Sequence, residues 1–391
     1  MDLRSIGLAT CLVLAPGGLA TAQAPVPPSG PGCEPVTADN AEDCLRVNHL
    51  QVIGTHNSYH VAPDPAILAA LGDRARAVDY THRPLAYQLE VLGMRQFEID
   101  VYADPEGGAY ASPDLTALGP GLARVPGPGP ELREPGLKVL HTAPYDFRTT
   151  CATLRACLTE IRDWSRAHPR HVPIAVMIEV KDPSANERQR ALVPHAPPFD
   201  AAQLDSLDAG IRAVFDDDHL LTPDDVRGGA PTLRQAIAAR GWPTLRDARG
   251  KVLFLMDNTG PHRELYLAGR PTLEGRVMFV SVEPTHPAAA FAKMNDALGD
   301  GAARIAHAVR SGLIVRTRAD EPGREAHTGD TTRRDAALGS GAQYVSTDYP
   351  EPSPYPSGSG YVVQLPGTTG AARCSPVSAP RGCRDEWVVE R

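Results

Sequence analysis

The sequence predicts a single (β/α)8 barrel of the TIM type, an α/β fold, from three observations. Apolar strand-like runs alternate with helical patterns, as in folds that join parallel strands through helices. Eight such runs match the strand number of a TIM barrel. No Gly-rich phosphate-binding motif follows the first run, which disfavours a doubly wound open sheet. The expected strands cover residues 50–55, 95–101, 138–141, 173–180, 251–257, 277–282, 313–318 and 344–348.

Other segments connect or follow these strands. Residues 103–136 are rich in Pro and Gly and would form a long loop after the second strand. There it would either touch substrate at the barrel rim or form a surface insertion, and the barrel itself is expected in a regular or a distorted form. The barrel would span residues 45–350, and a tail over 351–391 would pack on it. Helical periodicity covers residues 151–168, 201–215, 233–240, 302–310 and 331–338.

Length and composition describe an ordinary globular protein. The 391 residues suffice for one large domain, and 42% of them are hydrophobic. The net charge of −8 argues against a nucleic-acid partner and gives no overall attraction to an anionic membrane. We expect a monomer that does not bind nucleic acid.

The N-terminus has the features of a secretory signal peptide over residues 1–24. Arg4 precedes a short apolar run over 6–14, and A-x-A cleavage sites follow at 20–24. This run and every later one are too short to span a bilayer, so no transmembrane segment is expected. Residues 25–44 would form a Pro-rich leader. We expect a secreted protein, extracellular or periplasmic.

The cysteines agree with export. Cys11 would leave with the signal peptide, and the even number that remains favours disulfides in an oxidising compartment. No C-x-x-C pair exists, which weakens zinc and redox interpretations. Other connectivities stay open, but the simplest pairs are Cys33–Cys44, Cys151–Cys157 and Cys374–Cys383.

Strand periodicity places a set of charged side chains inside the barrel. In the second and fourth strands one parity is apolar and would pack on the outer helices. The opposite parity is polar and would point inward near the carboxyl ends of the strands, where barrels hold catalytic groups. This inward set consists of Glu98, Asp100, Glu179 and Lys181.

The three carboxylates of this set cannot all stay ionised side by side without a positive partner. A hard divalent cation would resolve the conflict, and Asn57 could add an amide oxygen. Calcium is favoured over magnesium because four protein oxygens exceed what magnesium usually takes. A structural ion-pair network with Lys181 and Arg95 is the alternative, and spacing alone leaves both open.

Two histidines are candidates for proton transfer. His56 and His141 each follow an apolar run, and histidine titrates near neutral pH. Their position beside the carboxylates favours catalysis over a structural role. A serine-nucleophile triad is disfavoured because the sequence has no G-x-S-x-G motif. Four further histidines are expected to be ordinary surface residues: His60, His82, His168 and His171.

The ordered set of motifs resembles the catalytic barrel of calcium-dependent phosphoinositide-specific phospholipases C, above all the secreted bacterial enzymes. The resemblance spans roughly residues 45–385, and only the ordered set is specific. It rests on Ile53-Gly54-Thr55-His56-Asn57-Ser58-Tyr59, Glu98-x-Asp100, His141, Glu179, Val345-Ser346-Thr347-Asp348-Tyr349-Pro350 and Arg373-Cys374-x-Pro376-Val377.

This resemblance implies a reaction and a division of roles. The inositol 2-hydroxyl of phosphatidylinositol would attack the adjacent phosphodiester, releasing diacylglycerol and an inositol (cyclic) phosphate at a membrane or micelle surface. His141 would be the general acid and His56 a donor to a phosphoryl oxygen, with His56 or a carboxylate accepting the hydroxyl proton; these roles can be exchanged. The implied Ca²⁺ ligands are Asn57, Glu98, Asp100 and Glu179.

Substrate contacts are less defined by the sequence. Arginine pairs phosphate and sugar oxygens well, and Lys181 is a second phosphate candidate. Each candidate is equally explained by a structural ion pair or hydrogen bond. The candidates are Lys181, Arg316, Arg318, Asp257 and Tyr349.

Two rival functions remain. A glycerophosphodiester phosphodiesterase uses a similar barrel, but those enzymes typically begin with His-Arg-Gly where this chain has His56-Asn57-Ser58. A non-catalytic protein that binds lipid through calcium is the second rival. The presence of both histidines and all four expected ligands speaks against a decayed site.

Overall fold

The computed structural model describes residues 33–116, 118–119, 121–122, 128–358 and 360–390. The expected signal peptide and residues 25–32 of the expected leader lie outside this range. Residues 33–44 pack against the core, where Cys33, Val36 and Cys44 are buried.

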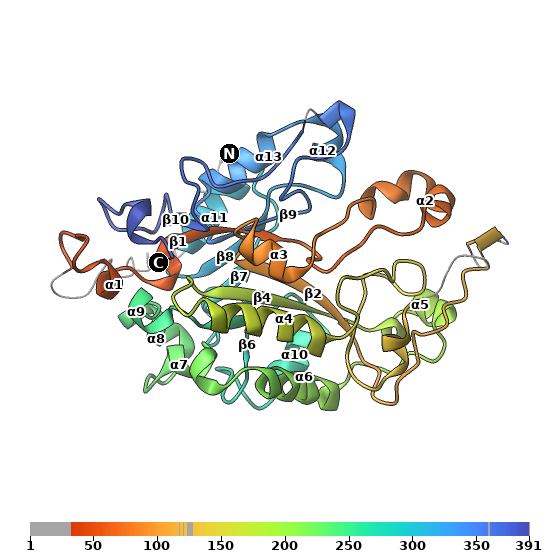
Figure 1. Cartoon of the computed structure of the whole chain (residues 1–391). Coiled ribbons are helices and arrows are strands. Elements are labelled where there is room, and N and C mark those ends of the chain that lie inside the picture. Colours follow the sequence, from red (N-terminus) through yellow and green to blue (C-terminus); the bar gives the residue numbers. More distant parts are fainter. Residues whose placement is uncertain (1–32, 117, 120, 123–127, 359, 391) are drawn as a thin grey trace, which may run out of the picture.

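Eight parallel strands form a nearly closed barrel, which confirms the predicted fold (Figure 1). The hydrogen-bonded order is β6-β5-β4-β2-β1-β9-β8-β7. The two ends of this sheet meet at a parallel bridge between Ser281 and Phe291. The strands are β1 (Leu50–Thr55), β2 (Gln96–Tyr102), β4 (Ile174–Lys181), β5 (Val252–Met256), β6 (Met278–Val280), β7 (Phe291–Lys293), β8 (Ile314–Arg318) and β9 (Tyr344–Thr347).

One expected strand was wrong. The run at 138–141 is not a barrel strand, because β3 (Lys138–Val139) pairs antiparallel with β2. The barrel position is taken instead by β7, which has three residues and follows three consecutive alanines. So short a strand, flanked by small residues, lacks the periodicity from which strands are predicted.

The barrel is split between β1 and β2. These strands share one register pair, Gly54 with Gln96. The edge of β1 that faces β2 pairs over its first half with β10 (Ala372–Cys374), and this pairing is antiparallel. On the facing side of β2, its last residues pair with β3. The chain thus inserts one short strand at each end of this seam, and the site described below lies at the β3 end.

Gly54 allows the two strands to touch at the middle of the seam. A Cβ atom at this position would lie 2.2 Å from Gln96 Oε1 and 2.6 Å from the Gln96 carbonyl oxygen. Real Cβ contacts are not that short, so a side chain here would push β1 and β2 apart.

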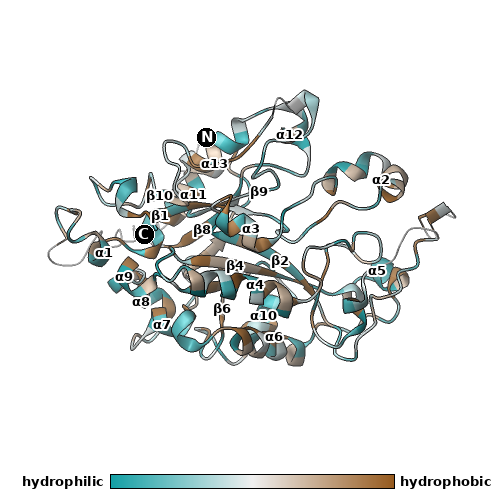
Figure 2. Cartoon of the chain, in the orientation of Figure 1, coloured by the Kyte–Doolittle hydropathy of each residue, from teal (hydrophilic) through white to brown (hydrophobic). Residues whose placement is uncertain are grey.

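Helices enclose the barrel, and Figure 2 shows the hydrophobic ribbon of the strands within this more polar shell. The five expected helices are confirmed as α4 (Leu154–Ala167), α6 (Ala201–Val214), α8 (Leu233–Arg240), α11 (Gly301–Arg310) and α13 (Thr332–Gly339). Side-chain caps start three of them, for example Thr153, whose Oγ1 accepts from Ala156 N before α4. The longer helices are α2 (Pro65–Leu71), α4 (Leu154–Ala167), α6 (Ala201–Val214), α8 (Leu233–Arg240), α10 (Pro261–Leu267), α11 (Gly301–Arg310) and α13 (Thr332–Gly339). The shorter ones are α1 (Ala41–Cys44), α3 (Leu85–Glu90), α5 (Glu187–Leu192), α7 (Pro223–Arg227), α9 (Leu245–Ala248) and α12 (Arg324–Thr328).

The described part of the 103–136 insertion packs beside the carboxyl end of the barrel, near α2 and α5 (Figure 1). Its side chains Tyr110, Leu115 and Leu132 join a second apolar cluster with residues of α2. Buried Lys138 ties the insertion down, because its Nζ lies 3.4 Å from Asp104 Oδ2 and donates to two carbonyl oxygens of the loop.

The three expected disulfides are confirmed: Cys33–Cys44, Cys151–Cys157 and Cys374–Cys383. The tail also contacts the barrel through an ion pair between Glu390 and buried Arg95. None of the helices in the described chain is both long enough and apolar enough to cross a bilayer.

Candidate active site

The expected inward-facing carboxylates lie together at the carboxyl ends of β2 and β4. The two strands pair in a register that sets Asp100 beside Glu179. Oxygen atoms of Glu98, Asp100 and Glu179 lie within 4.8 Å of one another. The strand periodicity therefore predicted this cluster correctly.

Two cations balance part of its negative charge. Lys181 Nζ lies 3.0 Å from Asp100 Oδ2 and 2.8 Å from Glu179 Oε2. Arg316, from β8 across the barrel, donates to Glu98 Oε2. Burial still raises the pKa of Glu98 to about 7 and the pKa of Asp100 well above its usual range, despite these cations.

Asn57 provides a further oxygen. Its backbone is left-handed, with φ of 45°, which an asparagine tolerates better than most residues. The side chain donates through Nδ2 to Tyr80 Oη at 2.9 Å, while the buried Oδ1 has no hydrogen-bond partner in the described chain. An orphaned amide oxygen and three crowded carboxylates are the donor set that a calcium ion requires, so these residues fit that ion.

His56, which follows β1, is held by a chain of buried charged residues at the ends of β9 and β8. Its Nδ1 donates to Asp348 Oδ1 at 2.7 Å, which leaves Nε2 facing Glu98 Oε1 at 3.6 Å. Arg318 Nη2 lies 2.7 Å from Asp348 Oδ2 and 3.2 Å from Asp320 Oδ1. Burial alone would raise the pKa of Asp348, but Arg318 and His56 outweigh it and hold the pKa well below its usual range. Burial and the charge of Arg318 lower the pKa of His56.

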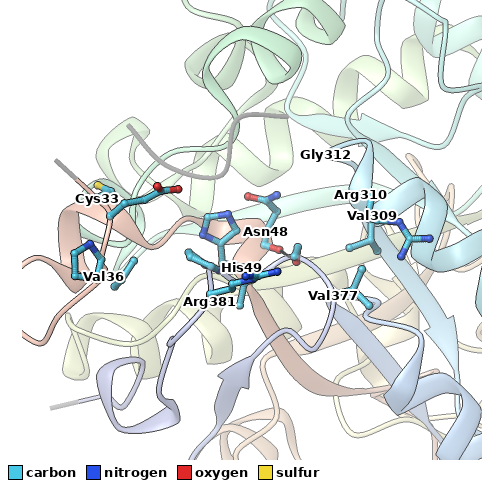
Figure 3. Close-up of a pocket in the computed structure, with 14 residues that line it drawn as sticks. Cys33, Val36, Asn48, His49, Val309, Arg310, Gly312, Val377 and Arg381 are labelled. Atoms are coloured by element: carbon cyan, nitrogen blue, oxygen red, sulfur yellow. Dashed lines mark hydrogen bonds between the residues drawn. The ribbon is translucent and has the colours of Figure 1, made fainter. Parts of the chain in front are cut away.

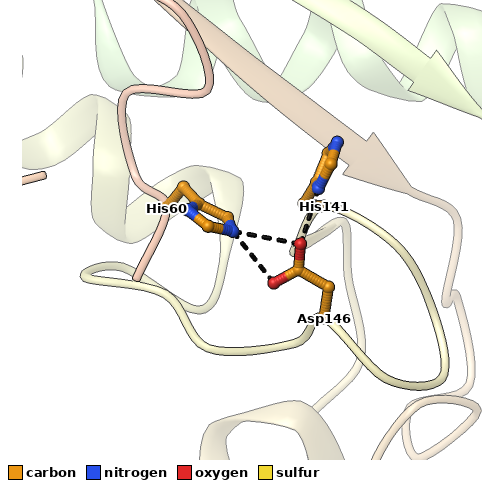
Figure 4. A group of neighbouring side chains, drawn as sticks. All are labelled: His60, His141 and Asp146. Atoms are coloured by element: carbon orange, nitrogen blue, oxygen red, sulfur yellow. Dashed lines mark hydrogen bonds and ion pairs between the residues drawn. The ribbon is translucent and has the colours of Figure 1, made fainter. Parts of the chain in front are cut away.

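His141 is held by a second carboxylate. Its Nδ1 lies 2.6 Å from Asp146 Oδ2, and the other ring nitrogen points away from that carboxylate (Figure 4). Asp146 also accepts a hydrogen bond from His60 Nε2, which lies 2.9 Å from Oδ1 and 3.0 Å from Oδ2. These three side chains lie close enough to bind a metal ion, but protons on the ring nitrogens account for each of the contacts.

The expectation that His60, His82 and His171 are surface residues was wrong, because all three are buried. His82 Nε2 donates to the His56 carbonyl oxygen at 2.9 Å, and Ser165 donates to His171 Nε2 at 2.7 Å. Burial lowers the pKa of both His82 and His171 to about 4. Both ring nitrogens of His60 and of His171 have hydrogen-bond partners, which makes their burial tolerable, whereas His82 has a partner for Nε2 alone in the described chain. The sequence gives no periodic pattern from which these partners could be predicted. His168 is exposed, as expected, and pairs with Glu90.

The expected substrate contacts differ in what they touch. Arg316 and Arg318 are buried behind Glu98 and Asp348. Lys181 reaches the carboxylate cluster, as described above. Asp257 pairs with Lys293 at 2.6 Å, a lysine that was not expected in the site. Tyr349 is buried among aromatic rings, and its hydroxyl has no partner in the described chain.

Besides Lys293, three functional neighbours were not expected from the sequence: His60, Asp146 and Asp348. Asp348 ends the last expected strand beside Tyr349, and that position at the barrel rim was an available signal. Asp146 lies in an irregular loop, where no periodicity indicates which way a side chain points. His60 gave no signal either, since it follows the first strand by several residues.

A separate pocket of about 780 Å³ lies at the opposite, amino end of the barrel (Figure 3). Its lining includes Asn48 and His49, which directly precede β1, and Gly312, which precedes β8. None of the expected site residues lines it. The candidate site is therefore at the rim described above.

Residues 45–376 match the family model of calcium-dependent phosphoinositide phospholipase C. A search of curated proteins found no match. A calcium-dependent phosphoinositol-specific phospholipase C from a Gram-negative Pseudomonas species is 17% identical, with 79% of this chain and 92% of that chain covered and a TM-score of 0.49.

Two further solved structures are similar. A Ca²⁺-dependent phosphatidylinositol-specific phospholipase C from Streptomyces antibioticus is 18% identical, with 78% of this chain and 95% of that chain covered and a TM-score of 0.48. The phosphatidylinositol-specific phospholipase C from Listeria monocytogenes is 13% identical, with coverages of 78% and 89% and a TM-score of 0.42. Because the family match covers most of the chain, this protein belongs to the calcium-dependent phosphoinositide phospholipase C family and is a phosphodiesterase with Ca²⁺ as its cofactor.

Proposed function

We propose that this enzyme cleaves the phosphodiester of phosphatidylinositol by attack of the inositol 2-hydroxyl, with His56 and His141 as the catalytic pair. The observation that carries the proposal is the matched setting of the two rings. Each has Nδ1 on a buried carboxylate, Asp348 or Asp146, and each keeps Nε2 for another partner. Diacylglycerol and an inositol (cyclic) phosphate would be the products.

We propose Asn57, Glu98, Asp100 and Glu179 as the calcium ligands, supported by their oxygens and by the raised pKa of the buried carboxyls. Calcium, when bound, supplies positive charge that acidifies a nearby hydroxyl and offsets charge on phosphoryl oxygens. Lys181 and Arg316 then leave the pocket with enough positive charge to attract a phosphodiester anion.

The tautomer of His56 suits it to accept the proton of the 2-hydroxyl. Because Nδ1–H donates its hydrogen bond to ionised Asp348, the lone pair of the neutral ring is on Nε2, on the side of Glu98. In the same way Asp146 holds the Nδ1 proton of His141. His141 Nε2 would carry the second proton and deliver it to the oxygen of the leaving diacylglycerol.

Among the remaining site residues we propose two classes. Lys181 is partly exposed and would contact the phosphate, while Asp257 and Tyr349 would contact ring hydroxyls. Arg316 and Arg318 are buried behind carboxylates and would act as counter-ions from the second layer. We also propose that the protein is secreted, which the three disulfides support.

The test is release of diacylglycerol from phosphatidylinositol in mixed micelles, with calcium and with chelator. We expect release that falls by about 10³-fold in chelator, since a bound cation is worth several kcal/mol to such a reaction. Phosphatidylcholine should not be cleaved. Cleavage of glycerophosphodiesters alone would instead favour the rival phosphodiesterase, and lipid binding without turnover would favour the non-catalytic protein.

The ligand set has its own test. Glu179→Gln should raise the calcium concentration for half-maximal activity about tenfold or more, because one anionic ligand is lost. Glu187→Gln, on exposed α5, is the matched control and should leave that concentration unchanged. Equal calcium requirements for the two variants would remove Glu179 from the ligand set.

A further inference from the structure

We propose that His60 is a positioning residue for His141, acting through Asp146. It would hold the Asp146 carboxylate so that Oδ2 keeps the Nδ1 proton of His141 in place. This inference rests on the proposed catalytic role of His141. It adds a buried residue three positions after Asn57 to the machinery of the reaction.

The hydrogen bonds of His60 define its state. Nδ1 lies 3.0 Å from the carbonyl oxygen of Tyr80, which can only accept, so Nδ1 carries a proton. Nε2 lies 2.9 Å and 3.0 Å from the two oxygens of Asp146, which is ionised because His60 and His141 hold its pKa below the usual range against the effect of burial. Both nitrogens therefore donate.

The Asp146 carboxylate is oriented by the two rings that contact it. Oδ1 has His60 as its ring partner, and Oδ2 is shared between His60 and His141. Without His60, the carboxylate could rotate about its terminal bond, since that torsion is soft. Rotation would move Oδ2 away from His141 Nδ1. The proton of the neutral ring would then no longer be fixed on Nδ1, and Nε2 would no longer be kept for the substrate.

His60 is itself held rigidly. Its ring packs on Tyr80 with centroids 4.4 Å apart and meets the edge of His141 at 5.5 Å. Its backbone carbonyl accepts from His82 N, and its backbone N–H donates to Asn57 O. The ring of His60 is thus fixed by Tyr80 and His141, and its backbone by Asn57 and His82. Of the two rings that contact Asp146, that of His60 reaches both oxygens and that of His141 reaches Oδ2.

Two variants separate this role from a merely structural one. Glutamine places its amide nitrogen near the position of histidine Nε2, so His60→Gln keeps a donor for Asp146. Asparagine places it near Nδ1, so His60→Asn keeps the Tyr80 contact and leaves Asp146 without that donor. Both remove the ring equally, which makes each the control for the other.

We expect His60→Asn to lower kcat on phosphatidylinositol by about 10- to 100-fold with KM little changed, as for other residues that orient a catalytic group. His60→Gln should recover most of this loss. In ¹⁵N spectra of the folded protein, recorded at a pH where the His141 ring is neutral, that ring should show one tautomer in wild type and His60→Gln and a mixture in His60→Asn. Thermal unfolding of both variants checks that they fold.

The spectra need no substrate, so they test the inference even if wild type fails to cleave phosphatidylinositol, which would overturn the proposed reaction. An unchanged His141 tautomer and kcat in His60→Asn would overturn the positioning role. Equal losses of kcat in the two variants would also overturn it, because the donor to Asp146 would then be irrelevant. If His60→Asn does not fold, His60→Gln alone tests the inference. A mixed His141 tautomer in this variant, or a fall in kcat of more than about tenfold, would contradict the role assigned to the hydrogen-bond donor at position 60.

Discussion

The two histidine–carboxylate pairs of the site look alike at the ring but are built differently. His56 and Asp348 come from the ends of β1 and β9, neighbouring strands, and are 292 residues apart in sequence. His141 and Asp146 are five residues apart and belong to one irregular loop. The sheet itself positions the first pair, whereas the second depends on the residues packed behind its loop.

The side chains behind the two carboxylates differ as well. Arg318 backs Asp348 with a guanidinium, which stays charged at any pH that a protein tolerates. His60 backs Asp146 with an imidazole held between two acceptors. A rigid strand end can use an arginine from the next strand, while a loop needs a shorter side chain that reaches it from nearby.

The largest expected effect separates the histidines by their distance from calcium. His141→Ala should lower kcat by about 10⁴-fold, as for loss of a catalytic acid, and leave calcium affinity within about twofold. His56→Ala should lower kcat similarly and also change calcium affinity severalfold, because His56 contacts Glu98 and adjoins Asn57. Turnover and calorimetric calcium titration measure both. A fall in calcium affinity for His141→Ala as large as for His56→Ala would erase the distinction.

A second, smaller effect tests the arginine behind His56. Arg318→Gln should lower the free energy of unfolding by about 3–5 kcal/mol, since it leaves Asp348 and Asp320 buried without their cation. Denaturant titration measures this loss. Arg384→Gln removes an exposed ion pair and should cost less than about 0.5 kcal/mol. A loss for Arg318→Gln as small as that of the control would mean that Arg318 does not offset the buried charge of these carboxylates.

The smallest effect concerns pH and the histidine that supports His56. The folded pKa of His82 is about 4, below the ordinary value of 6.5, so the unfolded chain takes up this proton first as pH falls. The contribution of neutral His82 to the free energy of unfolding is therefore fully present above pH 6.5 and is lost as pH falls towards 4. Between pH 6.5 and 5 we expect a loss on the order of 1–2 kcal/mol.

Variants isolate that contribution. His82→Gln retains a donor for the His56 carbonyl but does not titrate, so its unfolding free energy should fall less steeply in this pH range. His168→Gln, at an exposed histidine, should keep the wild-type slope. Identical slopes for His82→Gln and wild type would show that His82 does not carry this pH dependence.

The parts of the molecule that repeat could be predicted from the sequence, and those that do not repeat could not. Strand periodicity located the barrel and placed Glu98, Asp100 and Glu179 on one inner face, because a strand fixes the direction of each side chain. Near-neighbour spacing also predicted the three disulfides. In contrast, β7 is too short to show a period, and β3 runs against the barrel although its run of residues resembles a barrel strand.

The partners of the histidines show the same limit. Asp146 is oriented by a loop, and His60 is recognisable only through its contacts with Tyr80 and Asp146, residues 20 and 86 positions away. Asp348 was visible as a strand end, yet its pairing with His56 requires knowing that the first and last barrel strands are neighbours. The pairing of charged side chains on different strands depends on how the barrel closes, and local sequence patterns do not contain that information.

The strand β10 has a consequence for the order in which the chain is made. β1 is the first barrel strand to be synthesised, yet half of one edge waits for a partner that arrives later, with Gln51 bound by Arg373, 322 residues on. At the usual pace of translation that wait lasts on the order of tens of seconds. During this interval the edge of β1 is an open template for other chains, so a chaperone that covers it, or a chain kept unfolded until it is complete, would protect the growing protein.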